Sequence, residues 1–137
     1  MNFRGKVLLT DDEPHIRKFV SLILKKCGSP TVIEAPDGAA ALVMFEQHRP
    51  DLVLLDVNMP NLDGLQTLER LMKIDPDAVV VMLTSLTNRQ TVEDCLRLGA
   101  ADYIRKDTPP QEMVVQLQRI IQECFGDDPA PSTPPAS

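Results

Sequence analysis

Residues 51–64 read DLVLLDVNMPNLDG, with four consecutive apolar residues, 52–55, followed directly by Asp56. A run of strand length that is apolar at every position is typical of a strand covered on both faces, as in a parallel sheet. A second such run, residues 79–83, is followed by Thr84. Parallel strands need a crossover connection, usually a helix, so these two runs predict a β–α–β unit.

The same alternation extends outward through most of the chain. Shorter apolar runs occur at 7–9, 31–33 and 103–104. Apolar residues at helical spacing lie between the runs, as in the stripe formed by Ile16, Phe19, Val20, Ile23 and Leu24. Five strand–helix units in about 125 residues predict an α/β fold, a doubly wound five-stranded parallel sheet with helices on both faces.

Composition sets the limits of the interpretation. The chain has 137 residues, of which 43% are hydrophobic, so one ordinary hydrophobic core is expected. A net charge of −6, 4% aromatic residues and no tryptophan argue against a surface that binds nucleic acid directly. The sequence contains no apolar run near the ~20 residues needed to span a bilayer. The three scattered cysteines are expected to be free thiols in a reducing cytoplasm.

The last segment differs in composition from the rest. Residues 126–137 contain four prolines and no apolar residue larger than alanine, so they cannot bury enough surface to fold. We predict a folded domain over 1–125 and a flexible proline-rich tail or linker over 126–137. Such a segment is either a natural terminus or a linker to an effector domain, and the sequence leaves both possibilities open.

Polar residues stand at the ends of four predicted strands: Asp11-Asp12, Asp56, Thr84 and Lys106. In a doubly wound sheet the carboxyl ends of the strands form the working site, so these residues should converge. Clustered carboxylates favour a hard cation such as Mg²⁺ or Mn²⁺. A metal, a lysine and a hydroxyl together can hold a phosphoryl group. The alternative for Asp11 and Asp12 is that they only cap the following helix.

These motifs, with the stretch from Asp56 to Gly64, resemble the receiver domain of bacterial two-component response regulators over about residues 5–125. The chain is similar to the single-domain chemotaxis regulators of that family. The resemblance implies a flavodoxin-like (βα)5 fold with strand order 2-1-3-4-5. It also implies a role as a signalling switch rather than an enzyme, with at most self-catalysed phosphorylation and dephosphorylation.

The resemblance further implies a role for each site residue. Asp56 would accept a phosphoryl group from a histidine kinase or phosphotransfer protein. Asp56, Asp12 and the backbone carbonyl of Asn58 would bind Mg²⁺ (or Mn²⁺), and Asp11 would help through water. Thr84 and Lys106 would then contact phosphoryl oxygens.

As Thr84 moves, Tyr103 would swing inward and change the surface of the fourth and fifth strand–helix units. That surface would control a downstream protein or an effector domain, and dimerisation on phosphorylation is left open. Gly64 and Pro60 are expected to shape the loop that presents Asn58.

The chain departs from the family pattern in places. Asp107 follows Lys106, where the family typically has a proline after a cis peptide bond, so we expect a trans bond here. Asp107 also adds a carboxylate that could compete for Lys106. Ser85 stands where alanine or glycine is usual. From Asn58 and Leu86, which occupy positions that tune loss of the phosphoryl group, we predict an intermediate phosphoryl lifetime.

Three other functions would each require residues that differ from those in this chain. A degenerate receiver used only for docking should lack part of the Asp, Thr and Lys set. A Mg²⁺-dependent phosphohydrolase with Asp56 as nucleophile should have a general acid two residues later, where this chain has Asn58. An FMN-binding flavodoxin should have a hydroxyl-rich phosphate loop in place of Asp11-Asp12-Glu13. His15 and His48 have no partner at metal-ligand spacing and are expected to be solvated.

Overall fold

A computed structural model describes residues 3–59, 62–85 and 89–126. Within these ranges, strands and helices alternate along the chain. In order they are β1 (Lys6–Thr10), α1 (Pro14–Lys25), β2 (Thr31–Ala35), α2 (Gly38–His48), β3 (Leu52–Asp56), α3 (Gly64–Ile74), β4 (Val80–Thr84), α4 (Arg89–Arg97), β5 (Asp102–Arg105) and α5 (Pro110–Phe125). The roles predicted for Pro60 and Leu86, and the tail beyond residue 126, fall on residues outside the described ranges.

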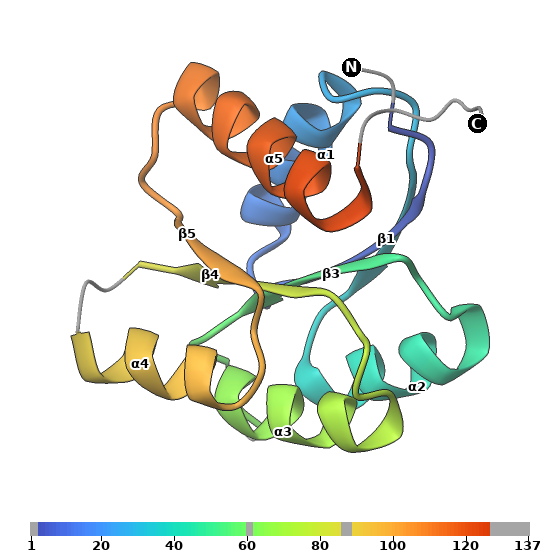
Figure 1. Cartoon of the computed structure of the whole chain (residues 1–137), viewed down its shortest axis with the longest axis vertical. Coiled ribbons are helices and arrows are strands. Elements are labelled where there is room, and N and C mark those ends of the chain that lie inside the picture. The colour runs from blue at the N-terminus through green and yellow to red at the C-terminus, as the bar shows by residue number, and fades with distance from the viewer. Residues whose placement is uncertain (1–2, 60–61, 86–88, 127–137) are drawn as a thin grey trace.

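The strands form one parallel sheet in the order β2-β1-β3-β4-β5, which confirms the predicted topology. Helices α1 and α5 cover one face of the sheet, and α2, α3 and α4 cover the other (Figure 1). The strand order reverses at β1, which has β2 on one side and β3 on the other. Ligands of doubly wound sheets bind outside the carboxyl ends of the strands at this reversal.

The two faces of the central strands build two separate cores. Leu9 and Leu54 lie in the cluster formed with α1 and α5, whereas Leu8 and Val53 lie in the cluster formed with α2, α3 and α4. All five residues of β3 are buried, and so are all five of β4. The unbroken apolar runs therefore reflect burial on both faces, as predicted.

Aspartates cap two helices on the lower face in Figure 1. The Asp37 side chain accepts a hydrogen bond from the backbone of Ala40 at the start of α2. Asp63 and Gln66 form a reciprocal capping box at the start of α3, in which each side chain accepts from the other residue's backbone N–H. These caps fix the start of each helix directly after a loop at the carboxyl edge of the sheet.

Asp11 and Asp12 do not cap α1. The N-cap residue is Glu13, and no side chain makes a capping hydrogen bond there. Asp11 Oδ1 instead accepts the backbone N–H of Glu13 at 2.8 Å, one residue ahead of the helix. The capping alternative is therefore wrong, and both carboxylates need another explanation.

The three cysteines are unpaired: Cys27 and Cys95 are buried and Cys124 is exposed. Among the described residues, no helix combines the length and apolarity needed to cross a membrane.

The two ends of the described chain are in contact: the ring centroids of Phe3 and Phe125 are 5.6 Å apart.

Candidate functional site

Strand geometry brings Asp11, Asp56 and Lys106 to one place. Successive strand residues point to opposite faces, so Asp11 continues the side of Leu9, and Asp56 lies on the side of Leu54. Both leucines belong to the core beneath α1 and α5. Lys106 directly follows β5, and its backbone N–H donates to the carbonyl of Thr84 at 2.8 Å. The three polar side chains therefore meet above the carboxyl edge of the sheet.

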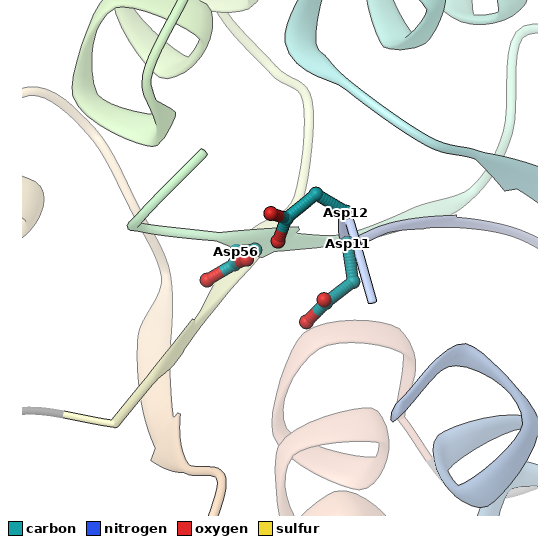
Figure 2. Close-up of side chains that lie close together, drawn as sticks. All are labelled: Asp11, Asp12 and Asp56. Atoms are coloured by element: carbon teal, nitrogen blue, oxygen red, sulfur yellow. The ribbon is translucent and has the colours of Figure 1, made fainter. Parts of the chain in front are cut away.

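Three carboxylates form an acidic cluster at this edge. Asp11, Asp12 and Asp56 each offer an oxygen within 4.8 Å of the others (Figure 2). Asp11 and Asp56 are fully buried, whereas Asp12 is exposed. Asp56 Oδ2 is buried and has no hydrogen-bond partner among the described residues. An unpartnered buried carboxylate oxygen beside two other carboxylates fits a hard divalent cation.

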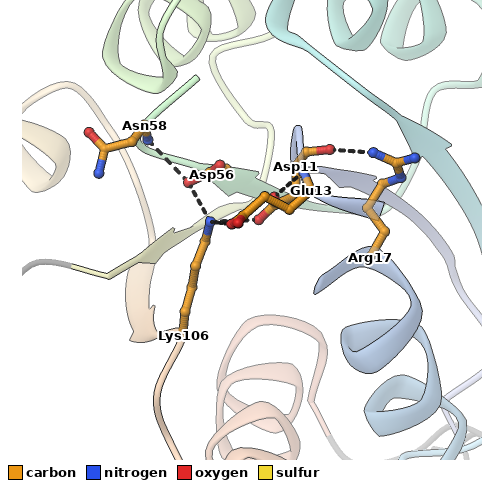
Figure 3. Close-up of polar contacts among 6 residues, drawn as sticks. All are labelled: Asp11, Glu13, Arg17, Asp56, Asn58 and Lys106. Atoms are coloured by element: carbon orange, nitrogen blue, oxygen red, sulfur yellow. Dashed lines mark hydrogen bonds and ion pairs between the residues drawn. The ribbon is translucent and has the colours of Figure 1, made fainter. Parts of the chain in front are cut away.

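Lys106 balances part of this negative charge. Its Nζ lies 2.8 Å from Asp11 Oδ2 and 3.0 Å from Asp56 Oδ1, and 3.6 Å from Glu13 Oε1 at the exposed rim (Figure 3). Asp56 Oδ1 also accepts the backbone N–H of Asn58 at 3.1 Å. One oxygen of Asp56 is thus held by two donors, and the other remains available to a ligand.

The environment shifts the pKa values of two of these groups. Burial raises the pKa of Asp56 to about 6; the hydrogen bond to Lys106 opposes this shift, and the charge of Asp11 adds to it. Burial acts to lower the pKa of Lys106, but its hydrogen bonds to Asp11 and then Asp56 outweigh burial, so that pKa is raised. Lys106 is therefore a fixed positive charge at neutral pH. Asp56, with its pKa raised to about 6, is mostly ionised at neutral pH.

The predicted switch residues lie at the neighbouring strands. Thr84 is buried at the end of β4, and Tyr103 on β5 is 40% exposed. The side chain of Asn58 is also exposed, next to the acidic cluster (Figure 3). Thr84 thus stands at the carboxyl end of β4, and Tyr103 lies on the neighbouring strand β5.

Asp107 pairs with a residue other than Lys106 in this structure. It pairs with Arg105, which donates to both Asp107 oxygens at 3.1 and 2.7 Å. The peptide bond between Lys106 and Asp107 is trans, as expected. The carboxylate of Asp107 is therefore held by the guanidinium of Arg105 on β5, while Lys106 pairs with Asp11 and Asp56.

A family model described as the response regulator receiver domain matches residues 7–118. The chain belongs to this family. The match spans β1 through most of α5, so it covers every element that contributes to the acidic cluster. Receiver domains are signalling domains of two-component systems.

Relatives of this receiver domain include proteins of similar size and longer ones. It is 36% identical over 116 residues to the chemotaxis protein CheY of Bacillus subtilis, covering 85% of this chain and 97% of the relative. It is 38% identical over 119 residues to a probable transcriptional regulator, ycf27, of Guillardia theta, covering 87% of this chain but only 46% of that protein.

Solved structures show the same pattern. Chemotaxis protein CheY4 of Vibrio cholerae matches with a TM-score of 0.78 and 30% identity, covering 86% of this chain and 99% of that chain. NtrX of Brucella abortus matches with a TM-score of 0.81 and 31% identity, covering 89% of this chain and 28% of that one. The receiver domain thus occurs both alone and as part of longer proteins.

Two contacts in this receiver domain were not predicted from its sequence. Glu13 approaches Lys106 only because the loop after β1 faces the loop after β5. The side chain of Arg17 reaches back from α1 to the backbone carbonyl of Asp11 at 2.6 Å.

Gly64 packs closely against the loop that presents Asn58, as expected. Its N–H donates to the carbonyl of Val57 at 2.9 Å, and a Cβ at this position would lie 2.6 Å from Val57 Cα.

Proposed function

We propose that this receiver domain is a phosphorylation-controlled switch in which Asp56 accepts a phosphoryl group from a phosphohistidine of a histidine kinase or phosphotransfer protein. The observation that carries the proposal is the buried, unpartnered Oδ2 of Asp56 beside Lys106 and two further carboxylates. In the transfer, the bond between phosphorus and the imidazole nitrogen breaks as an Asp56 oxygen bonds to phosphorus. The imidazole leaves with the electron pair of the broken bond.

The donor set fits Mg²⁺ or Mn²⁺, because the available ligands are carboxylate oxygens with room for water at the exposed side of Asp12. We assign Asp12, Asp56 and the backbone carbonyl of Asn58 as ligands, with Asp11 acting through water. When bound, the ion neutralises negative charge on the carboxylates and on the phosphoryl oxygens. The rigid strand β3 holds Asp56 in place, and Lys106 orients its Oδ1.

After transfer, Lys106 pairs with one phosphoryl oxygen and the Thr84 hydroxyl donates to another. Movement of Thr84 opens space for the Tyr103 ring, which is exposed before phosphorylation. The changed surface is formed by α4, β5 and α5, and it controls a downstream protein, an attached effector domain or a second copy of the chain.

The receiver occupies residues 1–125, and residues 126–137 form a tail or linker. The protein acts in the cytoplasm.

The test is to incubate the full chain with Mg²⁺ and a small phosphodonor and to measure intact mass. One phosphoryl adduct is expected on the wild-type chain and none on Asp56→Asn, which keeps the shape of the side chain. Asp51→Asn is a matched control, because Asp51 is an exposed aspartate at the opposite end of β3.

Two outcomes would contradict the proposal. Absence of any adduct, with both the phosphodonor and a phosphorylated kinase, would leave only a docking role. Steady release of phosphate over many turnovers would point to a phosphohydrolase instead, which the uncharged Asn58 two residues after Asp56 argues against.

A further inference from the structure

Arg17 connects three elements next to the acidic cluster. It lies near the start of α1, and its side chain is 17% exposed. Its Nη1 donates to the backbone carbonyl of Asp11 at 2.6 Å, and its Nε pairs with Glu34 Oε1 on β2 at 2.9 Å (Figure 3 shows the first contact). Both contacts use the guanidinium fork, which has a fixed planar geometry.

The carbonyl that Arg17 holds belongs to the peptide bond between Asp11 and Asp12. The N–H of Asp11 is held as well, because it donates to the carbonyl of Ala35 at the end of β2 at 3.2 Å. The backbone is thus fixed on both sides of Asp11. Because the orientation of a peptide plane sets the direction in which the next residue leaves the backbone, this clamp aims the exposed side chain of Asp12.

We propose that Arg17 is a positioning residue for the divalent cation, acting through the Asp11–Asp12 peptide bond and never touching the ion. The inference rests on the proposed function only for the identity of the cation site. Among the described residues, the Arg17 side chain donates hydrogen bonds to the backbone carbonyl of Asp11 and to Glu34. Among these residues it donates none to the carboxylates of the acidic cluster.

The direction in which Mg²⁺ affinity changes when Arg17 is removed distinguishes positioning from simple electrostatics. Arg17 carries a positive charge near a cation site, so its charge alone weakens Mg²⁺ binding, and its removal should tighten binding. Loss of positioning has the opposite effect, because Asp12 must then be ordered by the ion itself. Residues that orient metal ligands typically contribute 10–100-fold to affinity. We expect the lower end of that range, since Arg17 acts on the backbone.

The experiment titrates the full chain with Mg²⁺ alone and follows amide NMR shifts and the thermal unfolding midpoint. Arg17→Ala is expected to raise the Mg²⁺ dissociation constant about tenfold. Arg17→Lys keeps the charge but cannot form the two-way fork, so a severalfold increase is expected. Lys18→Ala is the matched control, because it removes the same charge from an exposed neighbour on α1. The Mg²⁺ dissociation constant of this variant should stay within about twofold of that of wild type.

Phosphorylation provides a second measurement. At low Mg²⁺ the Arg17 variants should form the phosphoryl adduct more slowly than wild type, and saturating Mg²⁺ should restore the rate because every carboxylate remains. If Arg17→Ala does not fold, Arg17→Lys decides the question.

Asp12→Ala shows whether the cation site is correctly assigned, because it should weaken Mg²⁺ binding. If it does so, but a folded Arg17 variant has an unchanged or lower Mg²⁺ dissociation constant, the inference is overturned. Wild-type protein that binds Mg²⁺ but forms no adduct would instead refute the proposed function and leave the role of Arg17 standing.

Discussion

Replacing Asp56 with asparagine is expected to stabilise the metal-free protein. Burial raises the pKa of this carboxyl from 3.8 to about 6, so ionised Asp56 destabilises the folded state. Because the folded pKa is the higher one, this cost is absent below pH 3.8 and is complete once the pH has risen through about 6. At 1.36 kcal/mol for each pKa unit, the full cost is about 3 kcal/mol.

Asparagine resembles the protonated carboxyl in shape and carries no charge, so it removes this cost. The gain over wild type in the free energy of unfolding should be about 3 kcal/mol at pH 7.5 and should fall to about 1 kcal/mol at pH 4.5. Urea denaturation in EDTA at both pH values, followed by far-UV circular dichroism, measures the two differences.

The control is Asp12→Asn, which removes a charge from the same cluster at an exposed position and should gain less than about 1 kcal/mol. Mg²⁺ should reverse the order, because it stabilises wild type more than the variant by binding the folded state. If Asp56→Asn is no more stable than wild type at pH 7.5, or if its gain does not change with pH, burial of an ionised Asp56 is not costly and the reasoning fails.

Three further predictions concern the same site. Lys106→Met leaves the buried carboxylates of Asp11 and Asp56 without a cationic partner. In urea denaturation without metal, the free energy of unfolding should fall by about 3 kcal/mol, and Mg²⁺ should restore part of it. Gly64→Ala places a methyl group against the backbone of Asp56 and Val57. It should lower the free energy of unfolding, measured by thermal denaturation, by about 2 kcal/mol and should slow formation of the phosphoryl adduct. Wild-type values for both would contradict the close packing. The Mg²⁺ dissociation constant, measured by calorimetry, should increase as the pH falls through about 6, because protons compete for Asp56, and a constant value between pH 5.5 and 7.5 would argue against Asp56 as a ligand.

The fold and the convergence of the site could be predicted because both follow from local patterns. The unbroken apolar run at 52–55 indicated a strand buried on both faces, and the structure buries all of β3. Parallel strands connected by helices bring their carboxyl ends to one edge. The positions of Asp11, Asp56 and Lys106 at strand ends were therefore enough to predict that they meet.

Contacts that depend on loop paths and side-chain reach could not be predicted. Asp107 and Lys106 are adjacent in sequence, which suggested competition, but the flexible Arg105 side chain reaches Asp107 from the other side. The contact between Arg17 and Glu34 requires the register of β1 against β2, which places Glu34 beside Leu9. Sequence spacing along one element does not contain such information.

The contact between Phe3 and Phe125 has a practical consequence for engineering. Because the ends of the described chain lie against each other, a short peptide can join them without crossing the site at the carboxyl edge of the sheet. The chain can then be opened at an exposed turn elsewhere, giving a circular permutant with the same core. Under the proposed switch, a fluorescent protein inserted at new ends next to α4 would report phosphorylation of Asp56 as an optical signal.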